Sequence, residues 1–228
     1  MFTPEELTAI GLSLKVAIVA ALASLPPGIA CGWLLARRRF PGKALLDALL
    51  HLPLVMPPVI TGYALLVVLG TQGPVGSWLV EHLGIQFAFR WTGAALACAV
   101  MGFPLMVRAI RLSIEATDRR LEAAAATLGA GPWRVFFSIT LPLAWPGLVA
   151  GMVLAFAKAL GEFGATITFV SNIPGETQTL SSAIYGLMQV PGMESGIWRL
   201  AGVALAISLA ALLLSEWLVR RPHPREDA

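Results

Sequence analysis

The sequence predicts an all-α polytopic membrane protein. Of its 228 residues, 57% are hydrophobic and only 13% are charged, whereas soluble domains carry about 25% charged residues. The mean hydropathy is +0.77. Apolar stretches of about 20 residues recur along the chain, which is the length that an α-helix needs to cross a bilayer. Five such stretches are expected, and the basic residues between them gather in particular loops, so the net charge of +3 indicates membrane topology and not nucleic-acid binding.

The first span is expected at 12–36 and the second at 49–70. Pro26 and Pro27 should break the first helix, because proline removes a backbone hydrogen bond and clashes with the preceding turn. The second span contains three prolines: Pro53, Pro57 and Pro58. We therefore expect a broken or kinked second helix, whose freed carbonyls are satisfied by neighbouring protein.

The remaining spans follow the same length rule. A polar loop with a short helix at 75–83 precedes the third span at 91–110. The fourth span is expected at 143–163. A long connection at 164–198 then leads to the fifth span at 200–219.

The basic residues predict the orientation of the chain. Twelve of the 16 lie in three segments, 37–43, 108–134 and 220–225, which share one side in a five-span chain. The opposite loops hold only Arg90 and Arg199. Because lysine and arginine concentrate in cytoplasmic loops, the N-terminus is expected outside and the C-terminus inside.

A sixth span is the alternative count. It would need 180–190 to enter the bilayer, and that run is too short to cross as a helix. The chain is therefore interpreted as a single transmembrane domain at 8–219 with a short cytoplasmic tail at 220–228.

The longest polar interval between two apolar segments is the loop at 115–142. Its residues 121–128 are rich in Ala, Leu and Glu, which favour a helix. The Gly-rich run at 129–131 should end that helix, and Pro132 can open another at its first position. A helix, a tight turn and a short helix would suit docking into a groove of another protein. An amphipathic loop lying on the membrane surface is the alternative.

Catalytic and metal-binding motifs are absent from the sequence. It has no G-x-x-x-x-G-K-[ST] phosphate loop, no G-x-S-x-G and no metal-ligand spacing among its three histidines. Cys31 and Cys98 stand alone in apolar spans and are interpreted as small packing residues. If the protein moves a solute actively, the energy must come from a partner or from an ion gradient.

A charged pair near the outer end of the fourth span is a candidate for the transport pathway. Lys158 and Glu162 are four residues apart and so share one helix face. They line a gate, or alternatively form an interfacial pair without contact to substrate. Thr166, Thr168 and Ser171 follow and supply small hydrogen-bonding groups that suit brief contact with a compact oxyanion. A plain external loop is the alternative.

The loop at 115–142 resembles the signature of binding-protein-dependent ABC transporter permeases, in which Glu-Ala-Ala is followed by Gly, Ile and Leu-Pro at fixed spacing. Gly129, Ile139 and Pro142 keep that spacing, whereas Glu122 stands one position before the family's glutamate. In the family this loop is the coupling helix that sits in a cleft of the ATPase subunit. The resemblance implies an ATPase contact through six residues: Glu122, Ala124, Ala125, Leu128, Gly129 and Ala130.

Further stretches resemble the permease subunits of bacterial molybdate ABC transporters. They lie at 40–47, 51–58, 103–111, 161–166 and 172–177. The combination of Gly-Glu-Phe-Gly in the fourth of these stretches with Asn-Ile-Pro-Gly-Glu-Thr in the fifth points to the molybdate and sulfate branch of the family. The resemblance implies the fold of type I ABC importer permeases.

The same resemblance implies how the protein works. Two permease copies would form a homodimer in the bacterial inner membrane, with two cytoplasmic ATPase subunits and a periplasmic oxyanion-binding protein. ATP and Mg²⁺ would bind the ATPase subunits, so this chain would hold no cofactor and would not itself be an enzyme. Molybdate is the expected substrate, tungstate is indistinguishable at this subunit, and sulfate or thiosulfate is the alternative. A secondary transporter is a third reading, but no clear internal repeat supports it.

Overall fold

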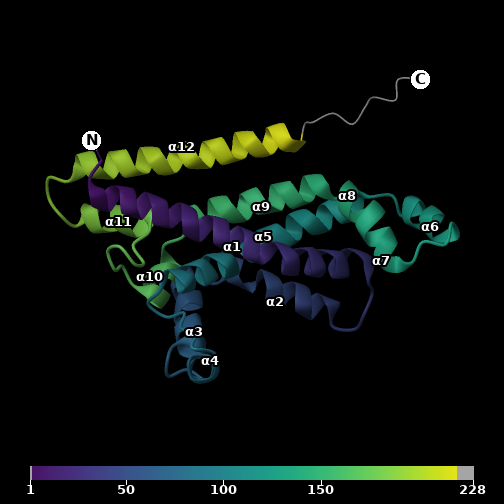
Figure 1. Cartoon of the computed structure of the whole chain (residues 1–228), viewed down its shortest axis with the longest axis horizontal. Helices are drawn as coiled ribbons and strands as arrows, with labels where there is room; N and C mark the ends of the chain where they lie inside the picture. The colour runs from purple at the N-terminus through teal and green to yellow at the C-terminus, as the bar shows by residue number, and fades with distance from the viewer. Residues whose placement is uncertain (1, 220–228) are drawn as a thin grey trace.

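The computed structural model describes residues 2–219, and within this range it is helical and contains no strand. The tail expected at 220–228, with its three arginines, lies outside the described residues. Four long helices run beside one another along the longest axis of the molecule (Figure 1). They are α1 (Pro4–Arg37), α5 (Trp91–Ala116), α9 (Trp145–Leu160) and α12 (Glu194–Val219).

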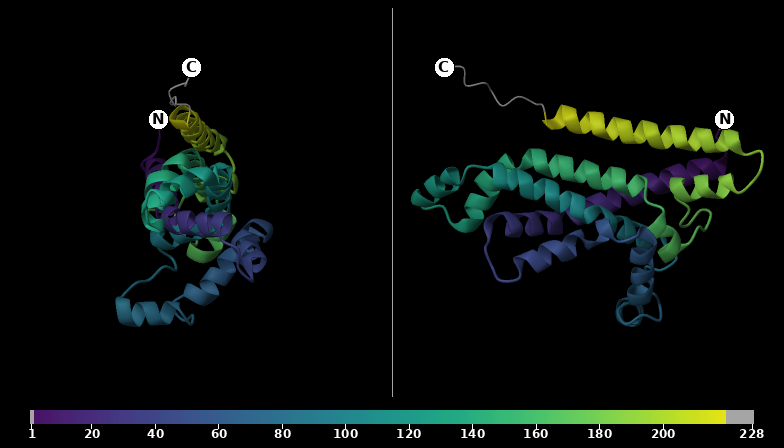
Figure 2. Two further views of the ribbon diagram at one scale, coloured as in Figure 1. Left: turned by 90° about the vertical axis from the view of Figure 1, so that its right-hand side faces the viewer. Right: turned by 180° about the vertical axis from the view of Figure 1, so that it is seen from behind.

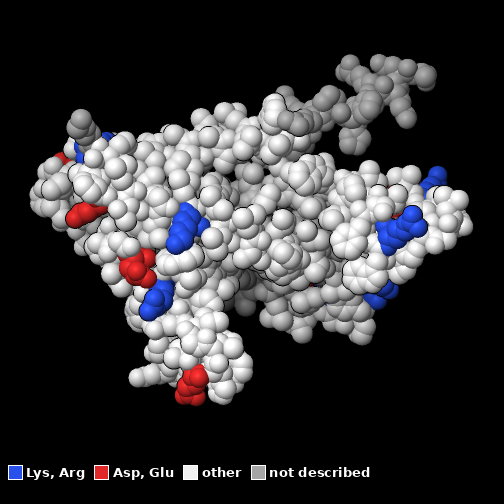
Figure 3. Space-filling model, in the orientation of Figure 1, with Lys and Arg blue, Asp and Glu red and all other residues white. Residues whose placement is uncertain are grey.

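Length and composition make three of the described helices, α1, α5 and α12, candidate spans on their own. Two bent pairs raise the number to five: α2 (Lys43–Val55) with α3 (Pro58–Leu69), bent by 112°, and Pro132–Leu143 with Trp145–Leu160, bent by 67°. On the face seen in Figure 3, charged side chains gather toward the two ends of the long axis and at the tip of the arm that α3 and α4 form, and an uncharged band separates the two ends. This distribution fits a protein that crosses a bilayer.

The predicted break at Pro26 and Pro27 is wrong, because α1 continues through both prolines as one helix. The buried face of α1 is made of small residues on both sides of the prolines, with Ser24 before them and Gly28 after them. A Cβ at Gly28 would lie 3.0 Å from the sulfur of Met106 on α5. Close packing of the two helices along this whole face outweighs the local cost of proline, which is about 3 kcal/mol.

The predicted break in the second span is confirmed. Helix α2 ends at Val55, Met56 is extended, and α3 starts at Pro58. A residue before proline is pushed out of the helical region, which explains why the chain turns here. The short helix expected at 75–83 is also present as α4 (Gly76–Leu83).

The connection expected at 164–198 contains two helices that were not predicted from the sequence, α10 (Gly164–Val170) and α11 (Leu180–Met188). A capping box between Thr179 and Ser182 starts α11. The N–H of Leu180 donates to the hydroxyl of Ser13 on α1 at 2.6 Å. The connection therefore folds back onto the N-terminal end of α1 and covers one end of the bundle.

The core between α1, α5 and α9 consists mostly of small residues. Ala17, Ala94, Ala97 and Cys98 are fully buried, and a Cβ at Gly102 would lie 3.2 Å from the backbone of α9. In a bilayer, small residues let helices approach closely and gain packing contacts. Helix α12 differs, because only 6% of its apolar stretch is buried. Figure 2 shows this helix along one side of the bundle.

Candidate functional site

The polar loop begins with α6 (Arg119–Thr127). The side chain of Asp118 starts this helix by accepting a hydrogen bond from the N–H of Arg120 at 2.9 Å. An aspartate at this position satisfies one of the free N–H groups of the first turn, and its negative charge interacts favourably with the positive end of the helix dipole. The helix predicted at 121–128 is therefore confirmed, with its start two residues earlier.

The Gly-rich turn after α6 is a Schellman motif. The N–H of Gly129 donates to the carbonyl of Ala126 at 3.0 Å, and the N–H of Ala130 donates to that of Ala125 at 3.1 Å. Gly129 has φ +84°, a left-handed conformation that other residues adopt only with strain. No atom lies within 4 Å of a Cβ built there, so the turn needs glycine for its backbone and not for space.

The second half of the loop is more irregular than predicted. It consists of α7 (Pro132–Val135), the π-helix η1 (Phe136–Thr140) and α8 (Leu141–Leu143). The N–H of Leu141 donates to the carbonyl of Phe136, five residues back. Pro142 has no N–H and its ring crowds the preceding turn, and a wider π turn relieves that crowding. The proline was visible in the sequence, but the π turn was not predicted.

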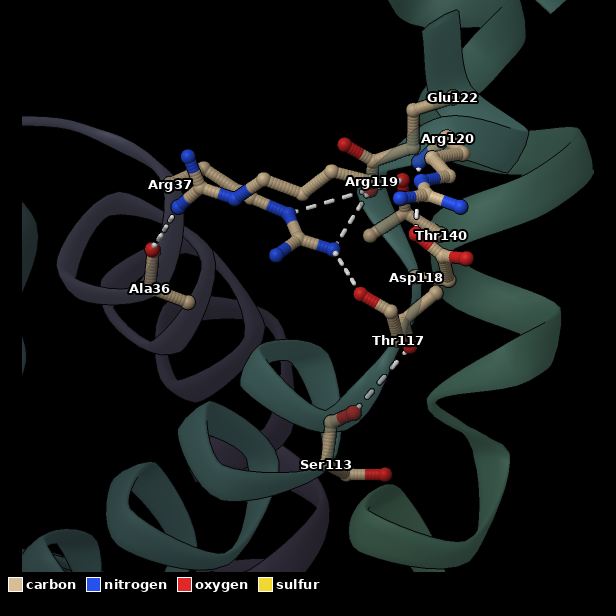
Figure 4. Close-up of polar contacts among 9 residues, drawn as sticks. All are labelled: Ala36, Arg37, Ser113, Thr117, Asp118, Arg119, Arg120, Glu122 and Thr140. Carbon is tan, nitrogen blue, oxygen red and sulfur yellow. Dashed lines mark hydrogen bonds and ion pairs between the residues drawn. The ribbon is translucent and has the colours of Figure 1, made fainter. Parts of the chain in front are cut away.

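Glu122 points from α6 toward the body of the protein (Figure 4). One of its carboxylate oxygens accepts from Nε and Nη2 of Arg37, at 3.1 and 2.9 Å, and from the hydroxyl of Thr140 at 2.8 Å. The Nη2 group of Arg37 also donates to the carbonyl of Thr117 at 3.2 Å. The side chain of Arg37 is only 8% exposed. This cluster ties α6 to the end of α1 and to η1.

The six residues expected at a partner contact therefore divide into two groups. Leu128 is 89% exposed at the tip of the loop, beside the exposed Gly129 and Ala124. Ala125 and Ala130 are partly buried, and Glu122 is turned inward. The exposed tip presents the apolar side chain of Leu128 to the surroundings.

The pair expected at the other end of the molecule is formed. Nζ of Lys158 lies 2.5 Å from Oε2 of Glu162. The second oxygen of Glu162 accepts from the N–H of Ala165 at 2.9 Å and so caps the start of α10. Glu162 is 2% exposed. This carboxylate joins the end of α9 to the start of α10.

The hydroxyl groups expected near this pair are partly engaged within α10. Thr166 donates to the carbonyl of Phe163 at 2.9 Å, and Thr168 donates to that of Gly164 at 2.6 Å. Each hydroxyl proton is thus used inside the helix, and only oxygen lone pairs face other groups. Ser171 is exposed and has φ +66°, which is unusual for a residue with a side chain.

A polar cluster between α2 and α5 was not predicted from the sequence. Arg111 binds Asp47 at 2.9 Å and Glu115 at 2.8 Å, and His51 lies 3.3 Å from the other oxygen of Asp47. These side chains, with Arg108, line a cavity of about 530 Å³. The i,i+4 spacing of Asp47 and His51 was the available signal. Within the described part of the chain, no group of three or more His, Cys, Asp or Glu side chains is placed to hold a metal ion.

The fold is a helical membrane domain with a folded polar loop at one end. The solved MetNI methionine ABC transporter has a similar fold: its matching chain gives a TM-score of 0.74 at 15% identity and covers 96% of this chain and 98% of that one. Residues 28–224 match the model of the family described as the binding-protein-dependent transport system inner membrane component. The chain belongs to this family.

Two curated relatives narrow the comparison. The molybdenum transport system permease protein ModB of Escherichia coli strain K12 is 62% identical over 99% of this chain and 98% of its own length. The sulfate transport system permease protein CysT of the same strain is 36% identical over 92% of this chain and 74% of its own length. The chain is therefore an inner-membrane permease, and of these two relatives it is more similar to the molybdenum protein.

Proposed function

We propose that this chain is the translocating subunit of an ATP-driven importer of molybdate. The observation that carries the proposal is the 62% identity, over nearly the full length of both chains, to the molybdenum permease of Escherichia coli. The polar loop supports it, because an exposed tip at Leu128 on a well-anchored α6 is suited to contact a second protein. Two copies of the permease, two cytoplasmic ATPase subunits and a periplasmic binding protein complete the proposed importer.

The contacts of the loop explain how such an importer transmits movement. A partner that moves the tip of α6 also moves Glu122, and Glu122 is bonded to Arg37 on α1 and Thr140 on η1. The same loop follows α5 directly, since α5 ends at Ala116. A rigid-body shift of the loop therefore passes to α1 and α5, which form the centre of the bundle. ATP and Mg²⁺ act on the ATPase subunits in this proposal, and this chain contributes the moving walls.

The orientation belongs to the same proposal. The loop tip, the turn between α1 and α2 and the C-terminal end of α5 lie together at one end of the molecule (Figure 1). This end carries the basic segments at 37–43 and 108–134. By the positive-inside rule it faces the cytoplasm, where the ATPase subunits reside. The N-terminus is then outside.

Uptake in proteoliposomes tests the function. The permease is reconstituted with its ATPase and supplied in turn with a molybdate-loaded and a sulfate-loaded binding protein. We expect ATP hydrolysis and uptake to be stimulated by the molybdate-loaded protein. Stimulation by the sulfate-loaded protein alone would move the chain to the sulfate branch, while uptake that needs no ATPase would contradict the importer class.

A further inference from the structure

A deep apolar groove separates α1 from α7 and η1. It encloses about 710 Å³, and Pro26, Ile29 and Trp33 of α1 form one wall while Phe136 and Phe137 of η1 form part of the other. The one charged residue that lines it is Arg38, at the end of α1, and within the described residues no acidic side chain lines it. The groove is therefore lined by apolar side chains, with the positively charged side chain of Arg38 at its mouth.

Four aromatic rings form a continuous surface along the groove. The rings of Trp33 and Phe136 meet edge-on with centroids 5.9 Å apart, those of Phe136 and Phe137 are 5.0 Å apart, and those of Phe137 and Trp133 stack at 6.3 Å. Trp133 is 75% exposed and Phe137 is 59% exposed. Large apolar side chains gathered in this way favour contact with another apolar molecule over water.

The length and depth of the groove indicate what fills it. From Pro26 to Arg38 the helix rises about 18 Å, at 1.5 Å per residue. That distance is close to the depth of one leaflet, which is about half of the roughly 30 Å hydrocarbon core. The end of the groove at Pro26 lies inside the membrane span of α1. A water-soluble ATPase cannot reach that end, whereas one acyl chain of a lipid can.

The mouth of the groove selects the charge of the lipid. The guanidinium of Arg38 lies 5.4 Å from the centre of the Trp33 ring. Arg38 is exposed, and among the described residues no ion pair is found for it. Arg37, by contrast, forms an ion pair with Glu122. An unpaired arginine at the mouth of the groove attracts the phosphodiester of an anionic lipid.

We propose that this groove is a binding site for an anionic phospholipid. One acyl chain lies along α1 between the prolines and the aromatic rings, and the lipid phosphate sits at Arg38. The bound lipid fills the groove between α1, α7 and η1, and so adds to the contacts that hold the loop in position. This proposal goes beyond molybdate import and does not depend on which solute is carried.

Photocrosslinking of the full-length chain tests the proposal. The protein is placed in phosphatidylcholine vesicles that contain a small fraction of a probe lipid with a diazirine in its acyl chain. The probe is phosphatidylglycerol in one sample and phosphatidylcholine, at the same fraction, in the other. Labelled peptides are mapped by mass spectrometry. We expect the anionic probe to label 26–38 and 132–141 about fivefold more than the zwitterionic probe, which is the contribution of one basic residue near an anionic lipid.

Two variants and two matched controls make the test specific. Arg38→Gln should bring the two probes to nearly equal labelling of the groove, whereas Arg90→Gln at the opposite end of the molecule should not. Ala30→Trp fills the groove from an exposed position on α1 and should reduce labelling by both probes. Ala210→Trp makes the same change on the exposed face of α12 and should leave labelling of the groove unchanged.

Two results would overturn the proposal. Equal labelling of the groove by the two probes in the unsubstituted chain would show ordinary surrounding lipid and no selective site. Disulfide crosslinking between two copies of an Ala30→Cys variant, without lipid labelling, would show that a second copy of the chain covers the groove. Either result leaves the uptake assay for molybdate unaffected, so a failure of the lipid site is distinguished from a failure of the proposed function.

Discussion

One carboxylate oxygen of Glu122 connects three elements of the structure, since it accepts from Arg37 and from Thr140. In the family pattern the glutamate would fall at position 123, where this chain has an exposed alanine. A shift of one residue turns a side chain by about 100° around a helix. The displaced Glu122 therefore faces the protein, and its contacts fit a role in holding the loop in place.

Replacing Glu122 should destabilise the protein. Glu122→Ala leaves the buried guanidinium of Arg37 with the carbonyl of Thr117 as its remaining partner. We expect a loss of about 1.5–3 kcal/mol in the free energy of unfolding, the usual value of a hydrogen bond to a charged group. Glu81→Ala is the control, because Glu81 is exposed on α4 and should change stability by less than about 0.5 kcal/mol. Thermal unfolding in detergent measures the stability of both variants, and equal losses would contradict a stabilising role of the contacts that Glu122 makes with Arg37 and Thr140.

A charge at Gly129 should prevent docking of the ATPase. Gly129→Asp places a Cβ at φ +84°, which costs roughly 1–2 kcal/mol, and adds a negative charge to the exposed tip. Gly131→Asp adds the same charge two residues later at φ −67°, where no strain arises. Co-purification with the ATPase should be lost for Gly129→Asp and reduced less for Gly131→Asp, with both variants present in the membrane. Normal docking and transport by the first variant would remove the coupling assignment.

At the scale of elements, the sequence predicted features that depend on local chemistry. The helix, turn and helix around Gly129 were predicted because helix formers, glycines and Pro132 lie in the required order. The continuity of α1 through Pro26 was not, because it depends on packing against α5. Helix α11 was missed because nine residues are too few for a span, although its capping residues were visible. The cluster around Asp47 joins helices that are distant in sequence, and spacing alone cannot show such a contact.

Close packing of α3 on α10 should make Gly62 sensitive to substitution. A Cβ at Gly62 would lie 2.4 Å from the carbonyl oxygen of Ala165, a backbone atom that cannot move aside alone. Gly62→Ala should therefore lower the free energy of unfolding by about 1–3 kcal/mol, as overpacking does. Gly202→Ala on α12 has open space around it and should be neutral or stabilise by up to about 1 kcal/mol. Urea or thermal unfolding measures the change in the free energy of unfolding for both variants. A loss of stability for Gly202→Ala equal to that for Gly62→Ala would contradict the role of close packing at Gly62.

At the scale of the whole molecule, the two ends have different contents. One end holds the loop at 115–142, the contact of Glu122 with Arg37, and the polar cluster between α2 and α5. The other holds the N-terminus, α10 and α11, and a shallow pocket lined by Pro4 and Pro174 shows that the start of the chain lies beside the turn after α10. The sequence predicted this division from the basic loops, because the positive-inside rule acts on the whole chain and not on one contact.

This arrangement predicts which residues can be labelled from each side of the membrane. Thr3 and Pro174 lie at the end that we propose to be outside, and Leu128, 89% exposed, lies at the opposite end. Single cysteines at Thr3 and Pro174 should react with a membrane-impermeant maleimide in intact cells. A cysteine at Leu128 should react only after the membrane is opened, because a charged reagent cannot cross the hydrocarbon core.

The unsubstituted chain is the control for this labelling, because Cys98 is fully buried and Cys31 is partly buried, so background reaction should be small. Labelling of the Leu128 cysteine from outside would reverse the proposed orientation, and with it the access of any cytoplasmic ATPase to the loop. Protection of Pro174 while Thr3 reacts would instead require an odd number of crossings between them, for example because one of the two bent helix pairs does not cross the bilayer. The labelling pattern therefore decides the orientation of the chain and the parity of the crossings between Thr3 and Pro174, and the loop motif of the family determines neither.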